Sequence, residues 1–132
     1  ADDFFTGLFG TALAADELLV AIHYPIPEAA AYRKFDQPAS RFALVGVAVA
    51  RFAGEVRCAI TGAAAGVFRA TAFEQALGDR FEPAALAGHR LDPNHLMTDL
   101  HAGAAYRAHL AAVLTARAVA AAAHPTPPNR SA

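Results

Sequence analysis

A short polar segment carries the densest chemistry in the chain. Residues 33–41 read Arg-Lys-Phe-Asp-Gln-Pro-Ala-Ser-Arg, which places three cations around one carboxylate. Such cations can bind an anion, and the amide of Gln37 and the hydroxyl of Ser40 add donors and acceptors for a polar planar ligand. The same composition also suits an ordinary solvated turn, which is the commoner use of these residue types. The segment therefore predicts either a solvated turn or a loop presented to an anionic or polar planar ligand.

Two strands are expected to hold this loop. Residues 32–35 form a short strand-like run that enters the loop, and the apolar residues 42–52 leave it. Because the second run is the most apolar part of the chain, we expect it in the middle of an antiparallel sheet. Residues 56–61 alternate between apolar and polar positions after a Gly-Glu turn, so they are expected to pair with residues 42–52 as a hairpin.

One further strand is expected before this hairpin and one helix after it. Residues 18–24 are rich in β-branched and aromatic side chains and are followed by prolines, which predicts a first strand. Thr71 and Glu74 have the spacing of a capping box, so a helix is expected from Thr71 to Leu77. Gly78 stands where a left-handed C-cap usually closes a helix.

The C-terminal half is predicted to be helical. A short helix is expected over residues 83–87, ended by Gly88, and a long one over residues 101–122. The long helix is expected to present one face made of Tyr106, Leu110, Val113, Leu114 and Arg117. Strands come first and helices follow, which is typical of an α+β fold. We therefore expect an antiparallel sheet of about four strands, helices packed on one of its faces and a long C-terminal helix.

Composition and charge exclude several classes of protein. Hydrophobic residues make up 55% of the 132 residues and charged residues 17%, which argues for one folded domain rather than a disordered chain. The net charge of −1 shows no excess of positive charge, which proteins that bind nucleic acid or anionic membranes usually have. No apolar run approaches the roughly 18 residues that cross a bilayer. The single cysteine, Cys58, rules out an internal disulfide or a multi-thiolate metal site, and it fits a cytoplasmic setting.

The sequence lacks the common signatures of catalysis and metal binding. His101 and His109 are about two turns apart on the expected long helix, which is too far for them to share a metal ion. The chain has no GxSxG nucleophile elbow, no GxGxxG dinucleotide loop and no GxxxxGK[ST] phosphate-binding loop. We therefore expect neither a resident metal nor a catalytic residue in this chain.

Four segments in order resemble one known family. They are FFTG…TAL…ELL in residues 3–19, YRKF…ALVGVA in residues 32–48, ITG…RATAFEQAL in residues 60–77, and YRAHL…VL…RA in residues 106–118. Together they resemble the C-terminal domain of the FAD-binding medium subunit of molybdenum hydroxylases, the family of carbon monoxide dehydrogenase flavoproteins and xanthine dehydrogenases. The resemblance covers nearly all of residues 3–119, and its order and spacing make it specific.

This resemblance implies that the chain is one part of a three-cofactor enzyme. Substrate is oxidised at a molybdopterin centre in a large subunit, and electrons pass through iron–sulfur clusters in a small subunit to FAD in the medium subunit. An N-terminal domain mainly holds the FAD, and the C-terminal domain closes over it. The implied organisation is residues 1–16 as a docked segment continuing from a missing FAD-binding domain, residues 17–123 as the C-terminal domain and residues 124–132 as a disordered tail. Alone, the chain is expected to show no activity and to hold FAD poorly.

The resemblance also marks residues that face the flavin. A leucine and a lysine that look like FAD contacts in relatives fall on Leu19 and Lys34, and the loop that carries Gln37 and Ser40 is implied to lie close to the isoalloxazine ring. A lysine beside the N1–C2=O edge of the ring stabilises the anionic reduced flavin and so favours electron acceptance. Relatives with an Arg-Glu-Asp-Asp loop differ from this chain, which has Pro-Ala-Ser-Arg in residues 38–41. The alternative is a stand-alone protein-interaction module derived from this domain, and a third reading is an unrelated small-ligand binder.

Overall fold

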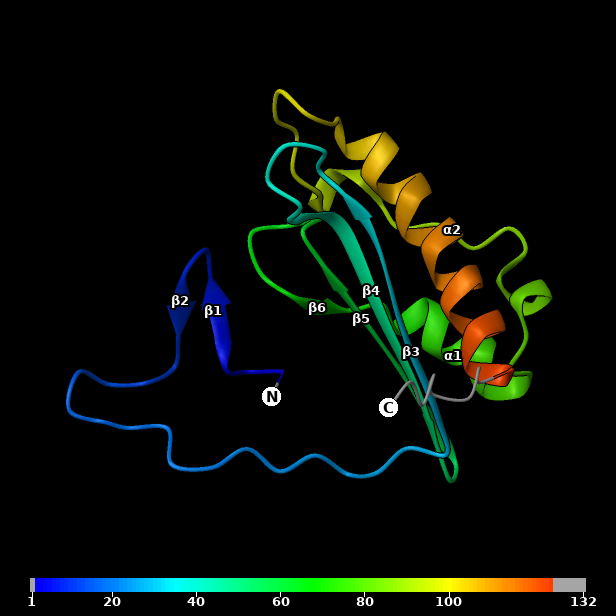
Figure 1. Ribbon diagram of the computed structural model, residues 1–132, viewed down its shortest axis with the longest axis horizontal. Helices are drawn as coiled ribbons and strands as arrows, with labels where there is room; N and C mark the ends of the chain where they lie inside the picture. The colour runs from blue at the N-terminus through cyan, green and yellow to red at the C-terminus, as the bar shows by residue number, and fades with distance from the viewer. Residues whose placement is uncertain (1, 125–132) are drawn as a thin grey trace, which may run out of the picture.

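The computed structural model describes residues 2–124, and its core is a four-stranded antiparallel sheet with helices on one face (Figure 1). The strands of this sheet lie in the order β3 (Ala29–Asp36), β4 (Ala43–Phe52), β5 (Glu55–Thr61) and β6 (Phe68–Arg69). The helical elements follow as α1 (Thr71–Asp79), the short 3₁₀ helices η1 (Pro83–Leu86) and η2 (Pro93–His95), and α2 (Ala104–Ala123). A separate two-stranded ribbon, β1 (Phe5–Gly7) and β2 (Gly10–Thr11), precedes them. The α+β architecture predicted from the sequence is confirmed.

The apolar strand β4 lies inside the sheet, as predicted, with β3 on one side and β5 on the other. Its side chains at Val45, Val47 and Val49 are fully buried in the core that the helices cover. Val47 pairs with Ile60 and Val49 with Cys58, so the inward faces of the two strands coincide. The predicted hairpin between these strands is confirmed, and the burial of its alternate residues follows from the period of two in the sequence.

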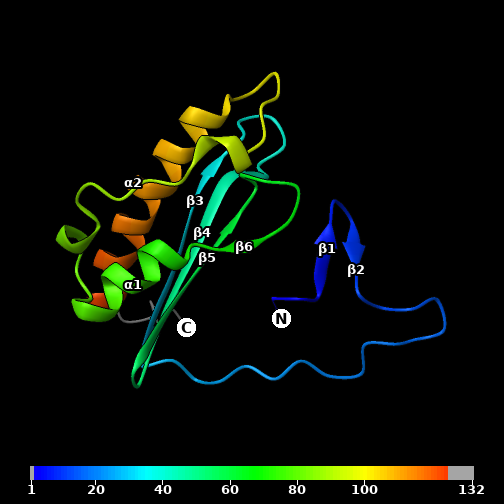
Figure 2. The same cartoon turned by 180° about the vertical axis from the view of Figure 1, so that it is seen from behind.

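Among residues 2–124, no helix covers the other face of the sheet. On β4 this face presents the small residues Gly46, Ala48 and Ala50. Tyr32 and Lys34 of β3 pair with Ala48 and Gly46, so their side chains share this face. The residues before β3 run along this side of the molecule, away from the helices, in both views (Figures 1 and 2). We call it the open face.

The long helix α2 packs on β3 and β4 with a stripe that differs in part from the prediction. Leu110 and Leu114 are buried as expected, whereas Tyr106 is 46% exposed and Arg117 is exposed. The buried stripe instead begins at Arg107, whose exposed fraction is 2%. The predicted face was wrong at Tyr106 and Arg117, because Arg107 finds enough hydrogen-bond acceptors to be buried and the helix turns that side toward the sheet.

The predicted first strand over residues 18–24 is wrong. These residues are extended in the structure, but they belong to neither sheet. β-Branched and aromatic side chains favour an extended backbone, but a strand also needs a neighbouring edge to pair with. No strand edge among residues 2–124 pairs with these residues.

The capping box predicted for α1 is also wrong. The N-cap is Ala70, and no side chain caps the helix. The carboxylate of Glu74 instead accepts the backbone N–H of Cys58 at 2.8 Å and pairs with the guanidinium of Arg69 through both of its oxygens. A strand amide and a cation therefore take the carboxylate that the prediction assigned to the backbone of Thr71.

The remaining C-terminal predictions have mixed outcomes. Gly78 lies inside α1, which continues to Asp79, so the C-cap predicted at Gly78 is wrong. The short helix predicted over residues 83–87 is present as η1, and Gly88 follows it with a φ of 80°. Of the tail predicted to be disordered, residues 125–132 lie outside the described residues.

Candidate functional site

The connection between β3 and β4 is a loop with its own hydrogen bonds. The amide of Gln37 donates to the carbonyl of Phe42 at 2.8 Å, and the amide of Arg41 donates to the carbonyl of Gln37 at 2.9 Å. Arg41 adopts a left-handed backbone with a φ of 62°, which costs a non-glycine residue roughly 1–2 kcal/mol. The loop is thus held in one shape at the end of the sheet, and we call it the hairpin tip (residues 37–42).

Gln37 and Ser40, which the resemblance marked as site residues, brace the hairpin tip. The carboxamide oxygen of Gln37 accepts the Ser40 amide at 2.6 Å and the Ser40 hydroxyl at 3.1 Å. The amide of Phe42 in turn donates to the Ser40 hydroxyl at 3.3 Å. The Ser40 hydroxyl is therefore committed to the loop. The Gln37 NH₂ group makes no hydrogen bond within residues 2–124 and can donate to a ligand.

Lys34 approaches the hairpin tip from β3 on the open face. Its ammonium donates to the carbonyl of Arg41 at 2.9 Å and lies 2.8 Å from the carboxylate of Asp36. The Lys34 side chain is 38% exposed, so the pair is partly in solvent and its attraction is weak. An ammonium carries three donors, and the contacts with Arg41 and Asp36 leave room for one more acceptor.

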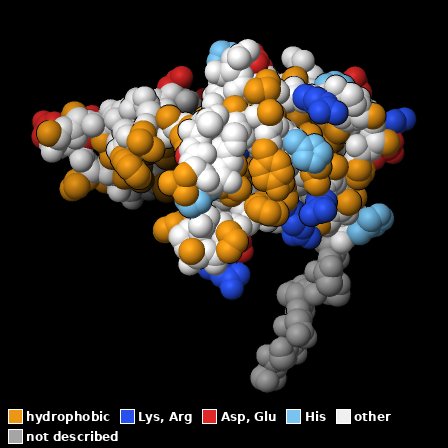
Figure 3. Space-filling model, turned by 90° about the horizontal axis from the view of Figure 1, so that it is seen from above, with side chains coloured by type: hydrophobic (Ala, Val, Ile, Leu, Met, Phe, Trp, Pro, Cys, Tyr) orange, Lys and Arg blue, Asp and Glu red, His pale blue; other side chains and the backbone are white. Residues whose placement is uncertain are grey.

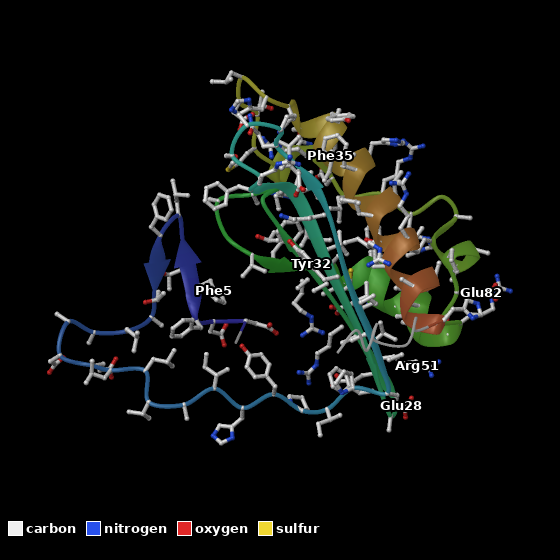
Figure 4. All side chains as sticks on the ribbon, in the orientation of Figure 1. Phe5, Glu28, Tyr32, Phe35, Arg51 and Glu82 are labelled. Carbon is white, nitrogen blue, oxygen red and sulfur yellow. The ribbon has the colours of Figure 1, made fainter. Side chains whose placement is uncertain are left out.

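Neighbouring residues of β3 point to opposite sides of the sheet. The ring of Phe35 packs edge-on against Tyr106 of α2, with ring centroids 6.4 Å apart. Tyr32 lies on the other side, on the open face (Figure 4). Its hydroxyl reaches over Gly46, where a Cβ would collide with both the hydroxyl and the methyl group of Thr61. Gly46 therefore allows the Tyr32 ring to lie across the sheet.

An open cavity of about 880 Å³ lies between the hairpin tip, residues 62–67 after β5, and the β1–β2 ribbon. Gln37 and Ser40 are among its lining residues. Its apolar lining includes Phe5, Phe9, Phe42, Leu44, Val67 and Met97. Figure 3 shows hydrophobic side chains on the projecting N-terminal segment beside the main body. A cavity of this size with a few polar groups on an apolar lining suits a small organic ligand or one end of a larger one.

Arg107 lines the same cavity and ties three segments together. Its Nη1 donates to the carbonyls of Leu44 at 2.7 Å and of Gly62 at 2.8 Å. Its Nη2 donates to the carboxylate of Asp99 at 2.7 Å, and its Nε donates to the carbonyl of Ala102 at 3.4 Å. One buried cation thus fixes the start of β4, the turn after β5 and the loop before α2 relative to one another.

Asp99 completes this arrangement. Its second carboxylate oxygen accepts the backbone amides of His101 at 2.9 Å and Ala102 at 3.0 Å. The pKa of Asp99 is held below its ordinary value. The largest cause is the hydrogen bond from the Ala102 amide, followed by that from the His101 amide and then by the Arg107 guanidinium. Asp99 is therefore ionised at neutral pH and acts as the counter-ion of Arg107.

The structure brings three of the four marked residues together. Lys34 hydrogen-bonds to the hairpin tip, and Gln37 and Ser40 lie within it. Leu19 is apart from them, since it is 54% exposed and lies in the extended segment before β3. Of the four marked residues, only Gln37 and Ser40 line the cavity. If all four residues contact one ligand, the ligand or the protein domain that holds it spans the space between this segment and the hairpin tip.

The sequence interpretation missed Arg107, Asp99 and Gly62. A signal for Arg107 was present, because it continues the buried stripe of Leu110 and Leu114 toward the start of the helix. Nothing local marked Asp99 or Gly62, whose roles depend on a side chain from α2.

Among residues 2–124, no cluster of three or more His, Cys, Asp or Glu side chains is placed to hold a metal ion. Within this same part of the chain, no helix combines the length and the apolar character needed to cross a membrane.

Comparison with known proteins gives its result at the level of structure. No family model matches the chain, and no curated protein matches it by sequence. Three solved structures match, and each match covers 92% of this chain and 46% of the matched chain. The chain therefore spans about half the length of these neighbours.

The neighbours are chains of two oxidoreductases. Reconstituted CO dehydrogenase from Oligotropha carboxidovorans superposes with a TM-score of 0.73 at 26% identity. The cyanide-inactivated form of the Cu,Mo-CO dehydrogenase superposes with a TM-score of 0.70 at 26% identity. Quinoline 2-oxidoreductase from Pseudomonas putida 86 has a TM-score of 0.70 at 24% identity, a likeness of fold alone.

Proposed function

We propose that the chain is the C-terminal, flavin-covering domain of the FAD-binding medium subunit of a molybdenum hydroxylase similar to carbon monoxide and xanthine dehydrogenases. In this proposal it takes part in electron transfer from iron–sulfur clusters to FAD. Its partners are an N-terminal FAD-binding domain, an iron–sulfur small subunit and a molybdopterin large subunit. The chain is not catalytic by itself, and the partner domain holds most of the FAD.

The agreement of two separate likenesses carries this proposal. Four sequence segments resemble the medium subunit of molybdenum hydroxylases in order and spacing. The fold matches chains of CO dehydrogenase and quinoline 2-oxidoreductase, which are molybdenum hydroxylases, over 92% of this chain. Because the match covers 46% of those chains, the activity and the partners of a whole subunit come to this chain only as part of the proposal.

The residues at the hairpin tip fit one side of a flavin. Lys34 keeps an ammonium donor beyond its contacts with Arg41 and Asp36, and Gln37 keeps its carboxamide donors. Both groups can donate to the carbonyl and ring-nitrogen acceptors of an isoalloxazine. The adjacent cavity of about 880 Å³ offers apolar walls for a ring system. The sequence has no glycine-rich pyrophosphate loop, so these groups form a cover rather than a complete FAD site.

The role of the chain's own residues follows from their charge and position. FAD, when bound, supplies the redox chemistry. The positive charge of Lys34 stabilises negative charge at the ring edge it faces, and the neighbouring Asp36 offsets part of that charge. The Lys34 side chain is 38% exposed and does not line the cavity, so solvent screens part of this electrostatic effect.

Replacing Lys34 tests the proposal in the assembled complex, purified through a tag on this chain. We expect Lys34→Ala to lower the FAD content or the reduction potential of the bound flavin, because a stabilising charge is removed. Arg33→Ala is the matched control, since Arg33 is a neighbouring exposed cation that pairs with Val47 and so belongs to the opposite face of β3. If Lys34→Ala leaves both the FAD content and the potential unchanged, Lys34 does not face the flavin.

The identity of the co-purified partner separates this proposal from a stand-alone interaction module. A flavoprotein partner with iron–sulfur clusters supports the proposal. A complex that repeatedly contains neither FAD nor iron rejects it and favours the module.

A further inference from the structure

Residues 18–27, which end one residue short of the start of β3 at Ala29, form an extended segment that no other part of residues 2–124 pairs with. Glu17 hydrogen-bonds back to Ala14, and Glu28 hydrogen-bonds to the carbonyl of Arg51. Between these two points, no backbone group of residues 18–27 bonds to another backbone group within residues 2–124. An extended backbone whose N–H and C=O groups have no backbone partner is a strand without a sheet.

The side chains of this segment alternate with a period of two. The even-numbered positions all carry large apolar side chains, and these are strongly exposed: Leu18 (85%), Val20 (92%), Ile22 (60%), Tyr24 (81%) and Ile26 (95%). The odd positions 19, 21, 23, 25 and 27 hold Leu, Ala, His, Pro and Pro, so the alternation is interrupted at Leu19 and holds from Val20 onward. Alternation of this kind is the pattern of a strand that buries one face in an apolar core. Within residues 2–124 the even-numbered face has no such core.

The two prolines show which edge of the segment can pair. In a strand, the backbone N–H and C=O groups of alternate residues point to opposite edges. Pro25 and Pro27 both lie at odd positions and lack the N–H, so the odd edge is deficient in donors. The even edge, from Leu18 to Ile26, keeps every donor and acceptor. The segment is therefore suited to pair on its even edge and to leave its odd edge unpaired.

Its own sheet is a poor partner for this edge. Tyr24 and Ile26 each precede a proline, which restricts them to extended conformations and keeps the segment from folding back onto β3. The free edge of β3 also carries the charged side chains of Arg33 and Lys34, which are typical of an edge protected against pairing. The same charges disfavour pairing with β3 of a second copy.

We propose that residues 18–26 add as the outermost strand to a sheet of the FAD-binding domain, with the even edge paired and the even side chains buried in that domain's core. The partner's identity rests on the proposed function, whereas the strand addition rests on the alternation and the prolines. Leu19 then lies on the odd-numbered face of the strand, opposite the face that is buried in the partner domain, and remains available to contact the flavin. A strand of this length spans roughly 30 Å, enough to cross a typical sheet edge.

Amide hydrogen exchange resolved to single residues tests the proposal on the complex purified through a tag on this chain. We expect the amides of Val20, Ile22 and Tyr24 to exchange on the order of 100-fold more slowly than in the chain alone. The amides of Ala21 and His23 are expected to remain fast, because their N–H groups point away from the paired edge. Uniformly fast exchange, or equal protection at odd and even positions, overturns the strand addition.

A pair of proline variants gives a second readout. Ile22→Pro removes a donor from the even edge, and Ala21→Pro removes one from the odd edge at the adjacent residue. We expect Ile22→Pro to weaken retention of the flavoprotein partner at least about tenfold, which corresponds to about 1.4 kcal/mol, and Ala21→Pro to change it less than about threefold. Equal losses in both variants contradict the assignment of the edge.

The outcomes separate this inference from the proposed function. Alternating protection in a complex that contains no FAD keeps the strand addition and rejects the flavin-covering role. If the complex contains FAD but the amides of residues 18–26 exchange freely, the flavin-covering role is kept and the strand addition is rejected. Alternating protection that appears in the chain alone as its concentration rises assigns the edge to a second copy and overturns the proposed partner.

Discussion

The guanidinium of Arg107 in α2 donates a 2.7 Å hydrogen bond to the carbonyl of Leu44 at the start of β4. A second bond from the same Nη1 reaches the carbonyl of Gly62 at 2.8 Å, just beyond the end of β5. The start of one central strand and the end of its neighbour are therefore joined through a side chain of the covering helix. The candidate site, which lies at this end of the sheet, takes its shape from that junction.

Removing the guanidinium is expected to be costly. Arg107→Met leaves the carbonyls of Leu44 and Gly62 and the carboxylate of Asp99 without their donor, so we expect a loss of about 3 kcal/mol or more in the free energy of unfolding. Arg117→Met on the exposed side of the same helix is the control and is expected to change stability by less than about 0.5 kcal/mol. Urea unfolding of both variants gives the two values, and equal stabilities contradict the role of Arg107.

Gly62 is predicted to tolerate no side chain. Its φ is 75°, and a Cβ would lie 2.5 Å from the carbonyl oxygen of Ala43 and 2.9 Å from that of Leu44. Gly62→Ala is therefore expected to cost about 2–4 kcal/mol, from backbone strain and displacement of β4 together. Gly88→Ala is the matched control, because Gly88 has a similar φ of 80° with nothing within 4 Å of its Cβ position. Gly88→Ala therefore measures the cost of a positive φ alone, which is about 1 kcal/mol. If Gly62→Ala costs no more than this, a Cβ at position 62 does not collide with the carbonyls of Ala43 and Leu44.

The parts of the fold that local pattern determines were predictable from the sequence. The strands β4 and β5 were found because their alternating or continuous apolar residues report burial directly, as Val47 and Ile60 illustrate. The hairpin tip was found because Asp36, Gln37 and Pro38 favour a turn between two such runs. In each case the residues that decide the structure are neighbours in sequence.

Features that depend on distant partners were not predictable. Arg107 is 63 residues from Leu44 and 45 from Gly62, so nothing near it in the sequence indicated that acceptors would be present. Glu74 likewise left its expected capping role for the amide of Cys58, which is 16 residues away. Residues 18–24 have the composition of a strand, but no strand among residues 2–124 pairs with them, and their own composition did not reveal this. Leu19 consequently lies apart from the other marked residues.

The ion pair between Asp99 and Arg107 predicts an acid limit to stability. Because the pKa of Asp99 is lowered in the folded protein, its contribution to stability is complete above the pKa of the unfolded state. The contribution is lost as the pH falls from about 4 through the lower folded-state pKa. We therefore expect the free energy of unfolding to decrease over this window in the wild type, and to decrease less in Asp99→Asn.

Asp79→Asn is the control for this pH dependence, since Asp79 lies exposed at the end of α1. It is expected to keep the wild-type slope between about pH 4 and pH 2. Chemical unfolding at a series of pH values supplies the slopes. A wild-type slope in Asp99→Asn contradicts the assignment of the acid limit to Asp99.

Cys58 is expected to be inert until the protein unfolds. Its side chain is fully buried, and burial raises the pKa of the thiol to about 12, although the nearby Thr115 hydroxyl, 4.0 Å from Sγ, acts in the opposite direction. The thiolate is the nucleophile that attacks a disulfide reagent, so the folded state prevents labelling both by denying access and by keeping the thiol protonated. We expect labelling of Cys58 by a chromogenic disulfide at pH 8 to be at least about 1,000-fold slower than in denaturant, because it waits for global opening. Ala39→Cys in the exposed hairpin tip supplies the fast reference, and comparable rates at positions 39 and 58 in the native protein would show that the core around β5 opens locally.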